Sequence, residues 1–183
     1  MNIFEKCESN VRSYCRSFPA IFHRAKGSIV YAESGEEYID FFAGAGALNY
    51  GHNNEYIKQK VISYLDADGI AHGLDMYTSA KEKFLAKFNE IVLSPKQLDY
   101  RIQFCGPTGT NAVEAALKLA RKVKQRTGIF SFMGAYHGMT LGSLSITGNT
   151  GVRAGTIGSL NNVTFMPYPY GFMESFDTIE YIE

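Results

Sequence analysis

A short glycine-bearing turn that leads directly into a helix is the part of this sequence best suited to binding a ligand. It reads Gly106-Pro-Thr-Gly-Thr-Asn-Ala-Val-Glu-Ala-Ala-Leu-Lys-Leu-Ala-Arg121. The backbone N–H groups of Gly109 and Thr110 fall among the first donors of the helix, which have no partner inside it. Such donors bind phosphate groups, and the helix dipole favours the negative charge. The turn is therefore either an anion site or a purely structural connection between a strand and a helix.

Two familiar nucleotide-binding motifs do not fit this turn. A Walker-type loop requires Lys followed by Ser or Thr after its second glycine, whereas Gly109 is followed by Thr110 and Asn111. The glycine spacing of a dinucleotide-binding fingerprint is also absent. An anion bound here is therefore not held by either of these nucleotide motifs.

The elements around the turn predict an α/β unit. Residues 101–105 resemble a strand, and residues 129–133 form a short apolar run typical of a strand buried on both faces of a parallel sheet. Between them, apolar residues recur at helical spacing, with Glu114 near the start and cations near the end, as the helix dipole favours. The apolar positions are Ala112, Ala116, Leu119, Ala120 and Val123.

The remaining segments are assigned from their periodicity and turn residues. We expect an N-terminal arm up to about residue 24, and a hairpin from the β-rich runs 28–33 and 38–42. The glycine-rich stretch 43–52 is either a close approach of backbone to a ligand or a flexible connection. Further along the chain we expect helices near 57–65, 80–92, 139–147 and 175–182, a loop at 68–77, a strand at 162–166 and a turn at 167–171.

Composition indicates a soluble globular protein. Of 183 residues, 45% are hydrophobic and 20% are charged, with 18 cations against 18 anions, so the charge balance gives no sign of a nucleic-acid partner. No membrane span or signal peptide is recognisable, and we expect a cytoplasmic protein. The cysteines, Cys7, Cys15 and Cys105, and the four separated histidines form no metal-binding spacing, so no metal is assigned.

Several motifs, in order along essentially the whole chain, resemble the class III pyridoxal-phosphate aminotransferases. They are Arg16-Ser-Phe-Pro19, Asp40-Phe-Phe-Ala-Gly-Ala-Gly-Ala-Leu-Asn-Tyr-Gly-His-Asn53, Asp68-Gly-Ile-Ala-His-Gly-Leu-Asp-Met76, Gly106-Pro-Thr-Gly-Thr-Asn-Ala-Val-Glu-Ala-Ala115 and Tyr136-His-Gly138. The resemblance implies an α/β fold, the N-terminal part of a fold type I PLP-dependent transferase, with an incomplete mixed sheet and flanking helices. It places the arm and hairpin of a small domain at 1–53 and the first part of the large cofactor-binding domain at 54–183.

The resemblance also implies the cofactor, pyridoxal 5′-phosphate, and its contacts. Gly109 and Thr110 would bind the phosphate, Tyr136 would stack on the pyridine ring, and His137 would lie beside it. Backbone donors at a helix start suit a phosphate, and an aromatic face suits a pyridinium ring. From composition alone, Tyr136 would instead be a core or rim aromatic residue.

Within the family, the motifs are most similar to the branch that makes 2,4-diaminobutyrate for ectoine. The implied reaction moves the amino group of glutamate, through the cofactor, to aspartate 4-semialdehyde. The alternatives are transamination of another ω-amino acid, such as ornithine, acetylornithine or 4-aminobutyrate, or formation of diaminobutyrate for siderophore or polyamine pathways. A further alternative is a non-catalytic chain that binds phosphate ligands or dimerises. The implied partners are amino acid and oxo acid substrates and a second subunit of a homodimer or higher homo-oligomer, with no nucleic acid or membrane.

The catalytic residues are not assigned. In the family, the lysine that links to the cofactor and the carboxylate that pairs with its pyridine nitrogen lie on later strands of the large domain, beyond Glu183. The lysines present here suit solvated positions. In the family's sheet, strands that come later in the sequence also separate the first strand of the large domain from the second. We therefore expect a truncated product that exposes strand edges and apolar faces, and that aggregates or requires the missing segment.

Overall fold

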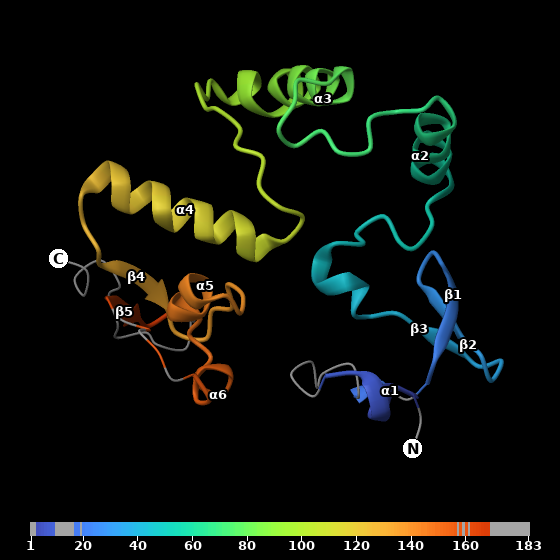
Figure 1. Ribbon diagram of the computed structural model, residues 1–183, viewed down its shortest axis with the longest axis horizontal. Coiled ribbons are helices and arrows are strands. Elements are labelled where there is room, and N and C mark those ends of the chain that lie inside the picture. The colour runs from blue at the N-terminus through green and yellow to red at the C-terminus, as the bar shows by residue number, and fades with distance from the viewer. Residues whose placement is uncertain are drawn as a thin grey trace. The chain divides into compact units, whose positions relative to one another are not determined.

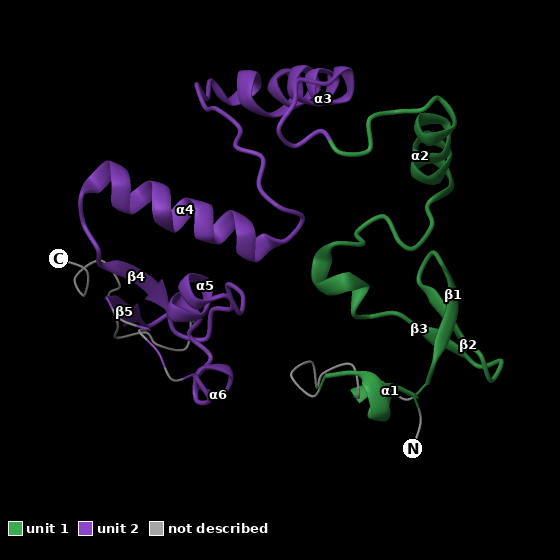
Figure 2. Cartoon of the chain, viewed as in Figure 1, with its two compact units in different colours: residues 1–72 green, residues 73–183 purple. Residues whose placement is uncertain are grey.

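The computed structural model describes residues 3–9, 17–18, 20–156, 158, 160 and 162–168. Cys15, Arg16, Pro19, the predicted helix at 175–182 and most of the predicted turn at 167–171 lie outside these residues. The chain divides into two compact units, residues 1–72 and 73–183 (Figure 2). The first unit includes the helix that follows residue 53, so the division falls later than the predicted domain boundary, which stays a prediction.

The first unit is built on a three-stranded antiparallel sheet (Figure 1). After helix α1 (Ile3–Cys7) come β1 (Phe22–Lys26), β2 (Ile29–Ala32) and β3 (Glu37–Ile39), in that order across the sheet. The hairpin of β2 and β3 confirms the prediction. The arm was wrong in its last residues, since Phe22–Lys26 forms a strand that pairs with β2 across a turn at Gly27, where φ is +59°.

A glycine-rich turn and a helix complete the first unit. The turn η2 (Ala43–Gly46) has left-handed backbone at Gly44, φ +57°, and at Ala45, φ +54°. Helix α2 (Glu55–Asp66) follows, and the side chain of Asn54, directly before it, accepts a hydrogen bond from the N–H of Ile57. This cap satisfies one of the free donors at the helix start and fixes where the helix begins.

The second unit opens with the predicted helix near 80–92. It consists of α3 (Ser79–Phe88), a wider π-helical turn η3 (Asn89–Leu93) and a short turn η4 (Ser94–Lys96). The side chain of Thr78 caps its start by accepting from the N–H of Lys81, and left-handed backbone at Gln97 follows its end. The ring of Phe84 contacts that of Phe104, with centroids 5.7 Å apart, and so joins this helix to the segment before the glycine turn.

The rest of the second unit pairs two parallel strands with helices. The elements are α4 (Gly109–Lys124), β4 (Ile129–Phe132), α5 (Leu141–Ile146), α6 (Thr150–Arg153) and β5 (Val163–Met166), and β4 pairs with β5 in parallel (Figure 1). Helix α5 packs against α4 and against both strands. All of these except α6 were predicted. The strand predicted at 101–105 is wrong as a description of this chain: these residues are in neither strand nor helix, because a strand requires a partner.

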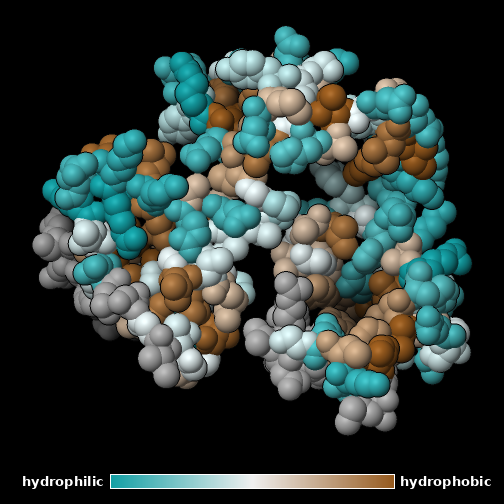
Figure 3. Space-filling model, in the orientation of Figure 1, coloured by the Kyte–Doolittle hydropathy of each residue, from teal (hydrophilic) through white to brown (hydrophobic). Residues whose placement is uncertain are grey.

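Burial is concentrated around α5. Leu144, Ile146 and Thr147 are buried together with Leu117 of α4 and Met166 of β5. The prediction that β4 is buried on both faces is wrong for one face, since Phe130 is 64% exposed. Figure 3 shows other hydrophobic residues at the surface of the molecule; Phe41, for example, is 92% exposed. Exposed apolar side chains in such number are typical of surfaces that pack against another segment or subunit.

Candidate functional site

The start of α4 presents unpaired hydrogen-bond donors. Thr108 caps the helix, its hydroxyl oxygen accepting from the N–H of Asn111 at 3.2 Å. In the part of the chain that the structure describes, the N–H groups of Gly109 and Thr110 make no hydrogen bond. A Cβ added at Gly109 would meet nothing within 4 Å, so the space beside Gly109 in which a side chain would lie is open. These two residues therefore have the geometry of an anion site.

The second predicted part of the site, residues 136–138, lies against this helix start. Gly138 has φ +124°, and a Cβ built there would lie 2.3 Å from the Oγ1 of Thr110. Any residue with a side chain would clash with Thr110 at this position, so the close approach requires glycine. The backbone N–H of His137 donates to the hydroxyl of buried Thr147 at 3.0 Å, while the side chain of Tyr136 is 63% exposed. The structure thus brings the 136–138 segment next to Thr110, while the cofactor-contact roles of the four predicted residues stay predictions.

Four side chains join α4 to α5 directly, and we call them the Glu114 cluster: Thr110, Glu114, Thr140 and Ser143. The Oγ1 of Thr110 lies 2.8 Å from the Oγ of Ser143 and 3.0 Å from the Oγ1 of Thr140. The hydroxyl of Thr140 donates to Glu114 Oε1 in a short hydrogen bond, and the N–H of Ser143 donates to the same oxygen at 3.0 Å. The cluster therefore connects the N-terminal half of α4 to the start of α5.

Glu114 is a member of the site that the sequence reasoning missed. It was interpreted only as an acidic residue that suits the helix dipole. The Thr140 hydroxyl is the main cause that lowers the pKa of this carboxyl, the Ser143 and Gly142 N–H groups add to it, and partial burial opposes them. The carboxylate is thus held ionised. The available signal was its spacing, since Glu114 follows Thr110 by four residues and so lies on the same helix face.

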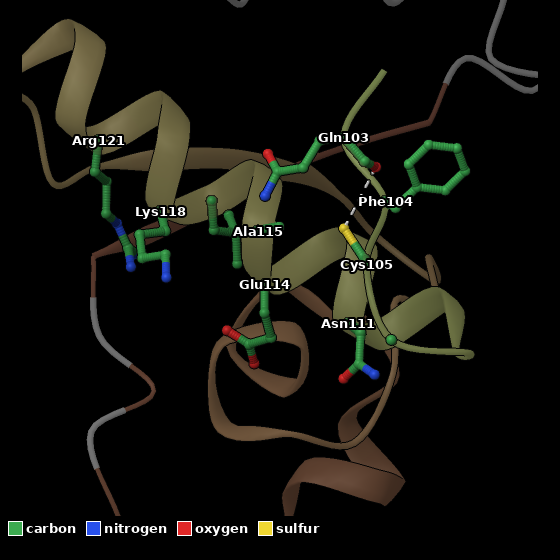
Figure 4. A pocket seen from close by; sticks show the side chains of 10 residues that line it. Gln103, Phe104, Cys105, Asn111, Glu114, Ala115, Lys118 and Arg121 are labelled. Atoms are coloured by element: carbon green, nitrogen blue, oxygen red, sulfur yellow. Dashed lines mark hydrogen bonds between the residues drawn. The ribbon is translucent and has the colours of Figure 1, made fainter. Parts of the chain in front are cut away.

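Beside the cluster, the other flank of Glu114 faces an open hollow of about 520 Å³. Figure 4 shows Asn111, Glu114, Lys118 and Arg121 along α4, across from the segment that carries Gln103 and Cys105. This is the segment predicted as a strand. Its own donor and acceptor groups include the carbonyl of Gln103, which accepts a weak bond from the Cys105 thiol at 3.8 Å.

In the first unit, a carboxylate and a histidine bracket the glycine-rich stretch. Asp40 Oδ2 lies 2.7 Å from His52 Nε2, and Asp40 Oδ1 accepts from the N–H groups of Phe42 and Ala43, each at 2.9 Å. The Ala43 N–H is the largest cause that lowers the pKa of Asp40, followed by His52. The stretch was interpreted either as a flexible connection or as a close approach of the backbone to a ligand. In the structure, the contact between Asp40 and His52 joins its beginning to its end.

The described residues contain neither a membrane-spanning helix nor a cluster of metal-binding side chains. Among the described residues, no helix combines the length and apolar character that crossing a membrane requires. Within those same ranges, no three His, Cys, Asp or Glu side chains gather in a way that could hold a metal ion.

Comparison with known proteins identifies relatives along the whole chain. The profile of the class III aminotransferase family matches residues 12–181. The chain is 58% identical to the diaminobutyrate–2-oxoglutarate transaminase of Halalkalibacterium halodurans and 56% identical to that of Sporosarcina pasteurii, in both cases over 100% of this chain and 43% of the relative. The chain therefore spans less than half the length of these curated relatives.

Solved structures agree with the sequence relatives. The taurine:2-oxoglutarate aminotransferase of Bifidobacterium kashiwanohense, solved with PLP and glutamate, matches with a TM-score of 0.69 and 25% identity over 87% of this chain and 35% of that one. The partial α/β sheets and flanking helices are thus the N-terminal part of a fold type I transaminase, and pyridoxal phosphate is the cofactor of the family. On these grounds the chain belongs to the class III aminotransferases.

Proposed function

We propose that the gene product carrying this chain transfers the amino group of glutamate to aspartate 4-semialdehyde, giving 2,4-diaminobutyrate and 2-oxoglutarate in ectoine biosynthesis. The observation that carries the proposal is identity of 52–58% over the full chain to relatives named diaminobutyrate–2-oxoglutarate transaminase. The substrates, the homodimeric assembly and the cytoplasmic location all belong to this proposal.

The residues present fit pyridoxal 5′-phosphate. Two free backbone N–H groups at an open helix start suit a phosphate dianion without the help of a lysine. Beside them, the exposed ring of Tyr136 is available to stack on a pyridine ring. We assign Gly109 and Thr110 to the phosphate, Tyr136 to the face of the ring, and His137 to a place at its side.

When bound, the cofactor supplies an electron sink for the bonds of the substrate's amino-bearing carbon. The part played by this chain is to bind and orient it. The N–H donors of α4 neutralise the phosphate, and the hydrogen bond from His137 N–H to Thr147 fixes the backbone that presents Tyr136. A fixed backbone at this segment would hold the ring in one orientation, and holding reacting groups in one geometry lowers the barrier to reaction. The proton-transferring lysine and the pyridinium carboxylate are assigned to no residue of this chain.

The test is amino transfer by the whole gene product. Its reading frame is first followed past the codon for Glu183, and the protein is then supplied with pyridoxal 5′-phosphate, glutamate and aspartate 4-semialdehyde. The expected result is glutamate-dependent formation of 2,4-diaminobutyrate with an equal amount of 2-oxoglutarate. A product that aminates the semialdehydes of ornithine or 4-aminobutyrate metabolism instead would replace this substrate assignment. A product that binds the cofactor but transfers no amino group would refute the activity.

A further inference from the structure

We propose that Glu114 is a positioning residue for the cofactor: it sets the spacing between the phosphate-binding pair, Gly109 and Thr110, and the ring-binding pair, Tyr136 and His137. The inference rests on the proposed cofactor site. Glu114 is assigned no contact with the phosphate or with the ring. Its expected effect is on the affinity for a ligand that binds to both pairs at once.

The first support is that one carboxylate oxygen accepts two hydrogen bonds from the segment that follows the ring-binding pair. Oε1 of Glu114 accepts from the hydroxyl of Thr140 and from the N–H of Ser143, the latter at 3.0 Å. Thr140 lies two residues after Gly138 and precedes α5. The carboxylate of Glu114 therefore binds the chain where it passes from the 134–138 segment into α5, and holds this part of the chain against α4.

The second support is that the backbone of residues 138–142 lies in direct contact with side chains of α4. A Cβ added at Gly142 would lie 2.2 Å from Glu114 Oε2, and a Cβ added at Gly138 would lie 2.3 Å from Thr110 Oγ1. Real Cβ atoms are not found at such distances from heavy atoms. The backbone of the 138–142 segment therefore rests directly on two side chains of α4, one from the phosphate-binding pair and one from Glu114 itself.

The third support comes from counting hydroxyl protons. The hydroxyl proton of Thr140 is donated to the carboxylate of Glu114. The hydroxyl proton of Thr110 is therefore donated either to Thr140 Oγ1 or to Ser143 Oγ. In both cases it remains inside the cluster. Thr110 then offers a phosphate its backbone N–H, with its side chain committed to fixing α5. This chain of donors ends on Oε1 of Glu114, and hydrogen bonds to an ionised acceptor, which the lowered pKa of Glu114 favours, are stronger than those to a neutral one.

The experiment separates positioning from simple folding by comparing two ligands of the whole gene product in its cofactor-free form. Inorganic phosphate needs the α4 start alone, whereas pyridoxal 5′-phosphate needs both halves of the site at the correct spacing. Dissociation constants for both are measured by titration calorimetry for the wild type, Glu114→Ala, Glu114→Gln and the control Glu82→Ala. Glu82 is an exposed residue on α3, far along the sequence from the cluster.

We expect Glu114→Ala to weaken the binding of pyridoxal 5′-phosphate by about tenfold, by analogy with the partners that orient metal-binding side chains, whose loss costs about 10–100-fold in affinity. Inorganic phosphate should change by less than about twofold. Glu114→Gln keeps an oxygen for the Ser143 N–H and should recover part of the loss. It also preserves the side-chain shape, so it reports on positioning even if the alanine variant fails to fold. Glu82→Ala should match the wild type for both ligands.

Three outcomes would overturn the proposal. Unchanged cofactor affinity in both Glu114 variants would show that the spacing does not depend on the carboxylate. Equal losses for phosphate and cofactor would show damage to the helix start instead of misplacement of the ring-binding half. A wild type that binds inorganic phosphate but not pyridoxal 5′-phosphate would refute the cofactor site, and this inference with it. That last failure is distinguishable because it appears before any substitution.

Discussion

The close approach of Gly138 to Thr110 predicts that Gly138→Ala damages both stability and cofactor binding. The substitution introduces two separate costs. An alanine at φ +124° occupies backbone space that L-residues rarely adopt, which costs about 1–3 kcal/mol. Its Cβ would also lie 2.3 Å from the Oγ1 and 2.7 Å from the Cβ of Thr110, and overpacking of this kind costs about 1–3 kcal/mol.

Together these costs give a destabilisation of about 2–6 kcal/mol, which is a large part of the roughly 5–15 kcal/mol that stabilises a typical domain. With a slope of about 2 kcal/mol per molar urea, the lower figure moves the unfolding midpoint by about 1 M. The measurement is urea unfolding of the whole gene product, followed by far-UV circular dichroism, alongside cofactor affinity. Gly155→Ala is the matched control, because a Cβ there meets nothing within 4 Å and its backbone is not left-handed.

A double-mutant cycle separates the two costs. Thr110→Ala in the Gly138→Ala background removes the Oγ1 contact but keeps the Cβ contact and the backbone strain, so it should recover only part of the lost stability. The expected coupling is about 1 kcal/mol, within the range for residues in contact. The reasoning is refuted if Gly138→Ala unfolds at the same urea concentration as Gly155→Ala, or if the two substitutions at 110 and 138 prove additive.

Three further predictions follow from single contacts. Thr147→Val leaves the N–H of His137 without its acceptor, so it should destabilise by about 1–3 kcal/mol in urea unfolding while Thr147→Ser stays near the wild type. Tyr136→Ala should raise the cofactor Kd by about 2- to 13-fold, the equivalent of 0.5–1.5 kcal/mol of ring stacking, and Tyr136→Phe should not. Asp40 has a lowered pKa, so its stabilisation is present above its ordinary value of 3.8 and is lost as pH falls through the folded value. The stability difference between wild type and Asp40→Asn should therefore shrink as unfolding is measured from pH 7 toward pH 3, and a constant difference would contradict it.

Local sequence predicted most of the second unit because its signals are local. Helix α4 combines a capping Thr108, an apolar face and cations in its last turn, and each of these acts within a few residues. The same holds for the strands near 129 and 163, which are short apolar runs. By contrast, β1 was interpreted as part of an arm, since Phe22–Lys26 has no apolar alternation and its assignment depends on pairing with β2.

The cluster around Glu114 was not predictable in the same way. Its carboxylate is satisfied by Thr140 and Ser143, which lie 26 and 29 residues further along the chain. Periodicity places Glu114 on the same helix face as Thr110, but it does not show which segment packs on that face. The strand predicted at 101–105 failed for a related reason, because strand propensity is local whereas a ladder needs a partner.

The two halves of the proposed site differ in what they require from the rest of the sheet. The pairing of β4 with β5, and the packing of α5 on both, fix the ring-binding segment from one side. The phosphate-binding turn instead follows residues 101–105, which have no strand partner in the described residues. Its position relative to the ring-binding segment is thus carried by side chains between α4 and α5, namely Thr110, Glu114, Thr140 and Ser143. Because the carboxylate of Glu114 bridges α4 and the start of α5 directly, its removal perturbs the spacing of the proposed site without changing the β4–β5 pairing, and this makes Glu114 a sharper probe of that spacing than a substitution in the sheet.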